Sequence, residues 1–186
     1  MPAEQRRSEI LHAAVEVFAE YGYTEATTDQ VARVAGVSQP YVVRMFGGKH
    51  ALFIAAHAQV FDRIESVFRA AVAERDPSLA PIEALGLAYL ELVPDRNVLR
   101  MMQHGFTVAA DPRFGSIVRD CLVRIYRLVR ELSGVSAEEA RTFIAHGLLI
   151  NTLVTVQLAQ VAGDDPYAAE LVRTTLGEGA LPTPAV

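Results

Sequence analysis

The sequence predicts an all-α protein of roughly nine helices. Apolar residues recur at helical spacing from end to end, whereas the sustained period-two alternation that marks half-buried strands is missing. The chain has neither an Asn-Gly nor an Asp-Gly dipeptide, the strongest hairpin signals. Residues that start helices, either Ser or Thr in a capping box or an Asp-Pro pair, separate the apolar segments.

The first helix is expected over about residues 4–21, because Leu11, Val15 and Phe18 then fall on one face. Gly22 follows as a left-handed C-cap, a backbone conformation that glycine adopts without steric cost. This helix therefore presents a single apolar stripe to the segments that follow it.

The second helix is expected to begin at Thr27. Thr27 and Gln30 have the spacing of a capping box, in which each side chain bonds the backbone N–H of the other residue. Val31 and Val34 are expected to face inward, and Gly36 ends the helix.

The third helix is expected to follow at once, with Ser38 as its N-cap. Pro40 is tolerated in the first turn, where its missing N–H is no loss. Because Pro40 cannot donate, the Ser38 hydroxyl is expected to bond the Tyr41 N–H. The paired glycines at positions 47–48 then end the helix.

Later helices are delimited in the same way. Asp76-Pro77 marks the end of one helix, whereas Asp111-Pro112, Asp165-Pro166 and a second capping box, Ser136 with Glu139, mark starts. The expected ranges are about 49–74, 81–93, 95–109, 111–134, 136–162 and 165–176, followed by a terminal tail.

The second and third predicted helices have the layout of a helix-turn-helix, in which two short helices flank a tight glycine-containing turn. The apolar positions that would lock the pair are Val31, Val37, Val42 and Phe46. On the other face, Gln39 suits adenine and Arg44 suits guanine in the DNA major groove. The residues expected to bind DNA are Thr27, Thr28, Arg33, Ser38, Gln39, Pro40, Tyr41, Arg44 and Lys49. An ordinary helical hairpin is the structural alternative.

Residues 6–54 resemble the N-terminal domain of TetR-family transcriptional regulators. The positions that carry the resemblance are Ile10, Ala13, Ala14, Phe18, Gly22, Tyr23, Thr27, Thr28, Val31, Ala32, Ala35, Gly36, Val37, Ser38, Phe46, Lys49, Ala51 and Leu52. The third helix departs from the family pattern, with Val43 where many members have a phosphate-binding tyrosine and Met45 where they have histidine. The DNA sequence that better-known members bind is therefore not transferable to this chain.

The resemblance implies a DNA-binding domain over residues 1–48 and a ligand-binding and dimerisation domain over residues 49–186. It implies a homodimeric repressor that binds a palindromic operator in double-stranded DNA. Dimerisation is expected through helices near 136–162 and 165–176, because the first of these is apolar nearly all round. The fourth helix would transmit effector binding to the DNA-binding domain.

The effector is expected to be a small, mostly hydrophobic molecule. The candidate residues are large or polar side chains in the middle helices: Tyr89, Met101, Met102, His104, Phe106, Phe114, Tyr126, Asn151 and Thr155. Most methionine and aromatic residues at helical spacing are core residues. Asn151 is the most specific candidate, because a buried amide needs partners, which either a ligand or the dimer mate could supply. Gly105, inside a predicted helix, marks either a hinge or a close contact.

Composition and charge restrict the classes of protein to which this chain can belong. The net charge of −5 argues against a general nucleic-acid-binding protein, although a basic edge on a specific DNA reader is compatible with it. A single cysteine, Cys121, and the lack of an apolar signal segment before Glu9 predict a cytoplasmic protein. Residues 142–163 carry no charge, but polar side chains interrupt them, so a buried helix is favoured over a membrane span.

No glycine-rich phosphate loop, nucleophile elbow or metal-ligand cluster is recognisable, and the five histidines are scattered. We therefore expect neither an enzyme nor a bound metal or cofactor. The alternative function is a helical small-molecule-binding or interaction protein that has lost DNA binding, which Val43 and Met45 keep open.

Overall fold

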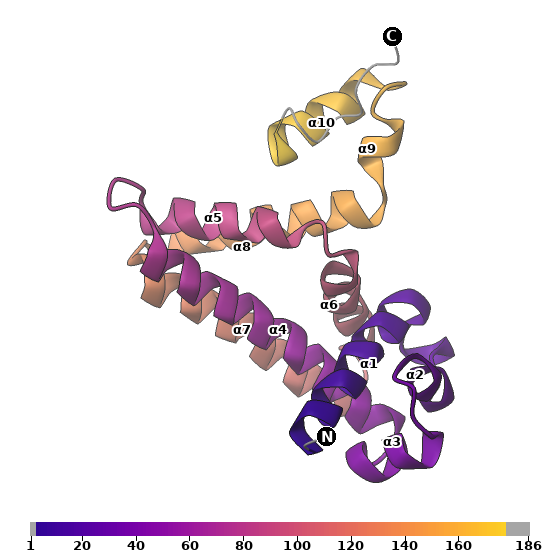
Figure 1. The fold of residues 1–186 in the computed structure, drawn as a ribbon. Helices are drawn as coiled ribbons and strands as arrows, with labels where there is room; N and C mark the ends of the chain where they lie inside the picture. Colours follow the sequence, from indigo (N-terminus) through magenta and orange to yellow (C-terminus); the bar gives the residue numbers. More distant parts are fainter. Residues whose placement is uncertain (1–2, 178–186) are drawn as a thin grey trace. The chain divides into compact units, whose positions relative to one another are not determined.

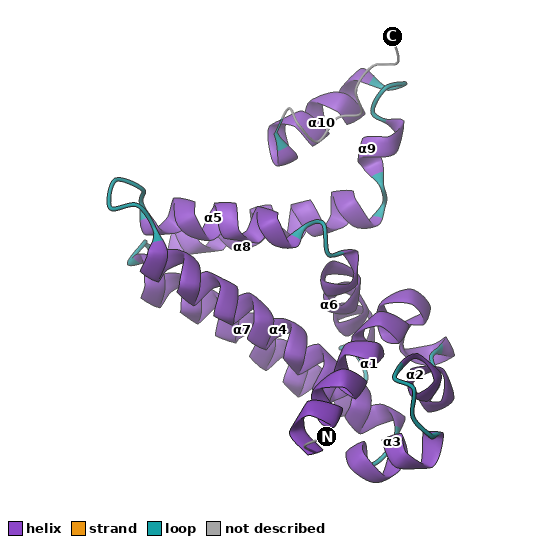
Figure 2. Ribbon diagram, in the orientation of Figure 1, coloured by secondary structure: helices purple, strands orange, loops and turns teal. Residues whose placement is uncertain are grey.

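The computed structural model describes residues 3–177, and every regular element within them is a helix (Figure 1; Figure 2). The all-α prediction is therefore confirmed. The helices of this part are α1 (Ala3–Glu25), α2 (Thr28–Val34), α3 (Gln39–Phe46), α4 (Lys49–Glu74), α5 (Pro81–Leu92), α6 (Arg96–Val108), α7 (Pro112–Ser133), α8 (Ala137–Thr155), α9 (Leu158–Val161) and α10 (Pro166–Leu176).

The prediction of one helix over residues 136–162 is wrong about where that helix ends. Helix α8 ends at Thr155, and Gln157 adopts the left-handed conformation with φ 56° and ψ 35°. Its N–H bonds the Val154 carbonyl at 3.1 Å, which tightens the last turn. The short helix α9 follows, so ten helices stand in the described part where nine were expected. The expected tail at residues 178–186 lies outside the described residues.

The chain forms two compact units. The first unit comprises Met1–Ser66 and Asn97–Ile125, and the second comprises Val67–Arg96 and Tyr126–Val186. Helices α1, α2 and α3 lie wholly in the first unit, and α5, α8, α9 and α10 lie wholly in the second. The functional division at residue 48 stays a prediction.

Each unit has its own apolar core. In the first unit, Phe18, Phe53 and Phe61 are at most 1% exposed and form its centre with α6 residues such as Leu99. In the second unit the buried residues include Phe68, Leu85, Val129, Ile150 and Val172. Burial of such side chains is the main favourable term in folding each unit.

Two further properties concern residues 3–177 as a whole. No helix among them has the length and apolar content needed to cross a membrane. No three His, Cys, Asp or Glu side chains within the same range converge on a point that would hold a metal ion.

Candidate DNA interface and ligand site

Helix α2 begins with the capping box that the sequence predicts. Thr27 Oγ1 accepts from the Gln30 N–H at 3.1 Å, and Gln30 Oε1 accepts from the Thr27 N–H at 2.7 Å. The helix ends at a turn in which Gly36 has φ 65° and the Val37 N–H bonds the Ala32 carbonyl at 2.9 Å. Local contacts thus fix the direction in which the chain enters α3.

Helix α3 begins differently from the prediction. The Ser38 side chain makes no capping bond, so the expected bond from its hydroxyl to the Tyr41 N–H is wrong. The Tyr41 N–H instead bonds the Ser38 backbone carbonyl at 3.0 Å, which leaves the hydroxyl exposed beside Pro40. Val42, fully buried, and Phe46 seat the opposite face of the helix.

The outer face of α3 carries the residues expected to read DNA. Arg44 is exposed, and its guanidinium lies 5.2 Å from the Tyr41 ring centroid, which orients it. Gln39 Nε2 donates to Thr28 Oγ1 at 3.0 Å, so an α2 residue positions this amide. Val43 is 36% exposed on the same helix, and its side chain has no group that could form a hydrogen bond.

Two of the predicted cationic residues have partners within the protein. The guanidinium of Arg33 forms a solvent-exposed ion pair with Asp29 at 2.8 Å. The Lys49 ammonium donates to the Thr24 carbonyl at 2.9 Å and lies 4.8 Å from the Tyr23 ring centroid. Lys49 therefore ties the start of α4 to the end of α1, a role that its sequence position did not indicate.

Sequence reasoning missed Arg6. This α1 residue lines a surface hollow of about 440 Å³ together with Val37, Ser38 and Tyr41. Its guanidinium also pairs with Glu9 at 2.9 Å. A cationic side chain next to an unengaged hydroxyl at the start of α3 is suited to a DNA phosphate. The sequence feature that could have indicated this role is the pair of adjacent arginines at positions 6 and 7.

His104, predicted to contact a ligand, lies against α1. Its Nε2 is 3.2 Å from the Ala19 carbonyl, and its ring packs over Gly22, where α1 kinks. One helical turn earlier in α6, Arg100 pairs with Glu20 at 2.9 Å. Helix α6 is therefore fastened to the end of α1 within the first unit.

Phe114, another predicted ligand residue, belongs to an aromatic cluster in the first unit. Its ring lies edge-on to those of Tyr23, His50 and Phe53, at centroid distances of 4.7, 4.7 and 5.4 Å. Phe114 is 2% exposed, which fits a core residue that joins α7 to α1 and α4.

The other predicted ligand residues do not share one place. Met101 and Met102 are buried in the part of α6 that belongs to the first unit, and Phe106 is half-buried further along that helix. Tyr126 is half-buried on the second-unit part of α7, whereas Thr155 is exposed at the end of α8.

Tyr89 and Asn151 do come together, in the second unit. The Tyr89 hydroxyl donates to Asn151 Oδ1 at 2.6 Å, joining α5 to α8. Asn151 is 0% exposed, and its Nδ2 has no hydrogen-bond partner among the described residues. Burial raises the pKa of the Tyr89 phenol to about 12, so the hydroxyl stays protonated.

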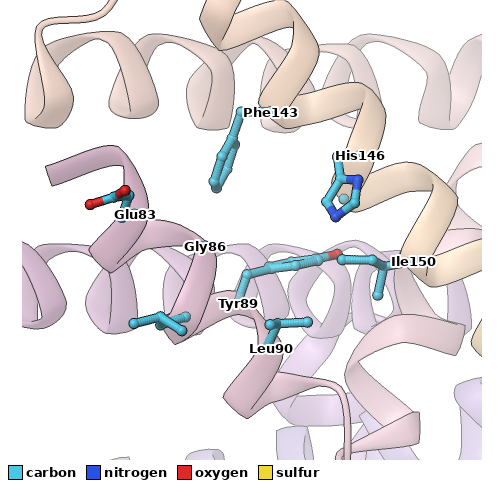
Figure 3. A pocket seen from close by; sticks show the side chains of 9 residues that line it. Glu83, Gly86, Tyr89, Leu90, Phe143, His146 and Ile150 are labelled. Carbon is cyan, nitrogen blue, oxygen red and sulfur yellow. The ribbon is translucent and has the colours of Figure 1, made fainter. Parts of the chain in front are cut away.

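A pocket of about 210 Å³ lies between α5 and α8, with Tyr89 of this pair in its wall. In Figure 3, Phe143 and His146 extend from α8 toward the Tyr89 ring on α5. The lining residues are Glu83, Gly86, Leu87, Tyr89, Leu90, Phe143, His146, Gly147 and Ile150. Most are apolar, as expected of a site for a hydrophobic molecule.

Gly105 marks a close contact, one of its two predicted roles. It packs directly on the ring of His57 in α4, and a methyl group at position 105 would overlap His57 Nε2. His57 is 1% exposed between Phe53 and Phe61, and neither ring nitrogen has a partner in the described chain. Burial lowers its pKa to about 4, so the ring is neutral at physiological pH.

Comparison with known proteins points to one family. Residues 10–56 match the family model described as bacterial regulatory proteins, tetR family. This match covers α2 and α3 completely, most of α1 and the first turns of α4. The part of the chain that forms the helix-turn-helix is therefore the part that the family model recognises.

Longer similarities extend over most of the chain. The chain is 29% identical over 154 residues to the HTH-type transcriptional activator FasR of Mycolicibacterium smegmatis, which covers 80% of this chain and 69% of FasR. The HTH-type transcriptional regulator SrpR of Pseudomonas putida is 49% identical over 47 residues, or 25% of this chain and 22% of SrpR. The transcriptional regulator FadR of Bacillus subtilis, solved in complex with stearoyl-CoA, has the same fold, with a TM-score of 0.65 and 16% identity over 92% of this chain and 98% of FadR.

Proposed function

We propose that this chain, which belongs to the TetR family of bacterial regulatory proteins, is a homodimeric transcriptional regulator controlled by a small, mostly hydrophobic molecule. The observation that carries the proposal is the family match over residues 10–56, which covers a helix-turn-helix with an exposed reading face. Buried Val42 and Phe46 hold this face in place, and Arg44 projects from it.

The proposed DNA contacts divide into two kinds. Gln39, Tyr41 and Arg44 would meet base edges in the major groove, with Thr28 holding the Gln39 amide. Arg6 and the exposed Ser38 hydroxyl would meet phosphates, which set the register of the protein on the duplex.

The proposed dimer interface is the outer face of α8 with part of α10. Arg141, Ala145, Leu149, Thr152 and Val156 recur at helical spacing and are all exposed in the single chain. On α10, Tyr167 is 81% exposed and Leu171 is 40% exposed. A second copy would cover the apolar members of this set, and two-fold pairing would suit a palindromic operator. Sedimentation equilibrium should give the mass of a dimer.

We propose that the protein represses its target and that the effector releases it from the operator. The effector would bind in the second unit beside Tyr89 and Asn151, where an apolar pocket adjoins a polar pair. FadR in complex with stearoyl-CoA supports ligand binding by this fold, whereas the name of FasR describes an activator. A reporter gene behind the operator decides the direction: its expression should fall when the protein is present.

The experiment that tests the function is selection of genomic DNA fragments by the full-length protein, followed by a gel shift. Recovered fragments should share an inverted repeat whose half-sites are about one helical turn apart. If the protein folds and dimerises but enriches no sequence, the chain is instead a ligand-binding or interaction protein that has lost DNA binding.

A further inference from the structure

The core of the second unit contains an unsatisfied hydrogen-bond donor. Tyr89 occupies one lone pair of Asn151 Oδ1, but the two N–H groups of Nδ2 have no acceptor among the described residues. A buried donor without an acceptor costs folding free energy, so such groups are usually paired in native proteins. An acceptor on a bound molecule would remove this cost.

The surroundings of the pair are apolar and aromatic. The Phe68 ring lies 6.2 Å from that of Tyr89 and 5.9 Å from that of Phe143, measured between centroids. Helix α8 packs close to the Tyr89 ring at Gly147, where a methyl group would lie in van der Waals contact, 3.4 Å from Tyr89 Cε1. The Tyr89 ring thus lines the pocket between α5 and α8 while its hydroxyl holds the Asn151 amide.

We propose that the Tyr89–Asn151 pair is the polar recognition point of the effector site, and that the effector is an uncharged, mostly apolar molecule with a carbonyl-type acceptor oxygen. This inference rests on the proposed function and specifies the chemistry of its ligand. The apolar part of the molecule would lie in the pocket, against Tyr89 and Phe143.

The available groups select an acceptor and disfavour a charge. Asn151 Nδ2 can only donate, so a ligand with donors alone would leave it unsatisfied. Neither Lys nor Arg lines the pocket, and its ionisable lining residues are His146 and Glu83, so a carboxylate would meet one like charge and no permanent cation. An ammonium group could pair with Glu83, but it would leave Asn151 Nδ2 without an acceptor and would require desolvation in the apolar part of the pocket.

Three small aromatic probes test this chemistry: acetophenone, which carries a carbonyl, ethylbenzene, which carries no polar group, and benzylamine, which carries a cationic donor. Each is titrated into the full-length protein, with the Asn151 side-chain amide followed by NMR. Acetophenone should bind about tenfold more tightly than either other probe and shift the Asn151 amide signals. Equal affinities, or an unshifted Asn151 amide at saturation, would overturn the proposal.

Two substitutions give matched controls. Asn151→Leu should remove the preference for acetophenone and leave ethylbenzene binding nearly unchanged. Asn151→Asp offers an acceptor in place of the donor, so it should reverse the order and favour benzylamine. If both Asn151 variants still prefer acetophenone, the proposal is contradicted. If neither variant folds, the titration of the wild-type protein with the three probes decides whether the proposal holds. If the protein binds a specific DNA sequence but binds the three probes equally well, the proposed ligand chemistry is wrong and the proposed function still stands.

Discussion

The imidazole of His104 covers Gly22, the residue at which helix α1 kinks. Gly22 has φ 66°, and a methyl group there would lie 3.1 Å from His104 Cε1. His104 Nε2 is 3.2 Å from the carbonyl of Ala19, in the last turn before the kink. Helix α6 thereby holds the end of α1, from which the chain enters the helix-turn-helix.

Gly22→Ala should lower the free energy of unfolding by about 2–4 kcal/mol, because the left-handed backbone and the His104 ring both oppose a methyl group. Gly36→Ala is the matched control, since φ is 65° there and nothing lies within 4 Å of the added carbon. It should cost only the backbone strain, about 1–2 kcal/mol. Urea unfolding followed by circular dichroism measures both, and equal losses would show that the His104 ring does not constrain the kink.

Gly105→Ala should destabilise the protein by about 1–3 kcal/mol, although alanine is the better helix former. The added methyl group would overlap His57 Nε2, and the His57 ring is held between two phenylalanines. Gly86→Ala serves as control, because this helical glycine has nothing within 4 Å of the added carbon. The control should gain about 0.5–1 kcal/mol in the same unfolding assay. A stabilised Gly105→Ala variant would mean that α6 has no such contact.

Burial lowers the pKa of His57 from 6.5 to about 4, which predicts a pH dependence of stability. Between these values the unfolded chain binds a proton that the folded chain does not, so stability falls as the pH decreases. The loss amounts to about 3 kcal/mol at most. Urea unfolding at several pH values between 7 and 4 measures it.

His57→Phe should flatten the curve in that window, because phenylalanine cannot titrate. The Arg113 side chain lowers the pKa of Asp111 to about 2, so Asp111 affects stability only at more acidic pH, below 3.8. A variant that keeps the wild-type dependence between pH 6.5 and 4 would show that another group titrates there.

Arg44→Ala should weaken binding to the selected operator by about 1–3 kcal/mol, because a guanidinium that contacts a guanine edge is lost. The melting temperature and the dimer mass should stay close to those of the wild type, since Arg44 is exposed. Arg127→Ala, an exposed arginine in the second unit, is the control and should leave affinity unchanged. Unfolding of the Arg44 variant would assign the residue a structural role.

The features that the sequence predicts well are local. The capping boxes of Thr27 with Gln30 and Ser136 with Glu139 depend on residues three positions apart, so their spacing alone identifies two helix starts. The positive φ of Gly22 is local in the same sense, although the expected end of the helix there is wrong, because α1 kinks at Gly22 and continues to Glu25. Gln157 was missed because a residue other than glycine adopts this conformation only when tertiary contacts favour it.

The candidate sites were predicted less completely because they depend on contacts between distant residues. Residue type identified Tyr89 and Asn151 individually, but nothing in the sequence indicates that positions 62 residues apart share a hydrogen bond. In the same way, His104 was a plausible pocket residue by type, and its place on α1 depends on how α6 packs. Helical periodicity placed Val31 correctly in the buried face of α2 but was wrong for Val34, which is 49% exposed, and it does not indicate which helix covers a buried face.

The most direct test of the central claim is the affinity of the full-length protein for its selected operator, compared with a random duplex of equal length at physiological salt. Fluorescence anisotropy gives both dissociation constants. A sequence-specific regulator should bind the operator at least about 10³-fold more tightly than the random duplex. Equal affinity for the two duplexes would contradict the assignment of the helix-turn-helix as a DNA-reading element.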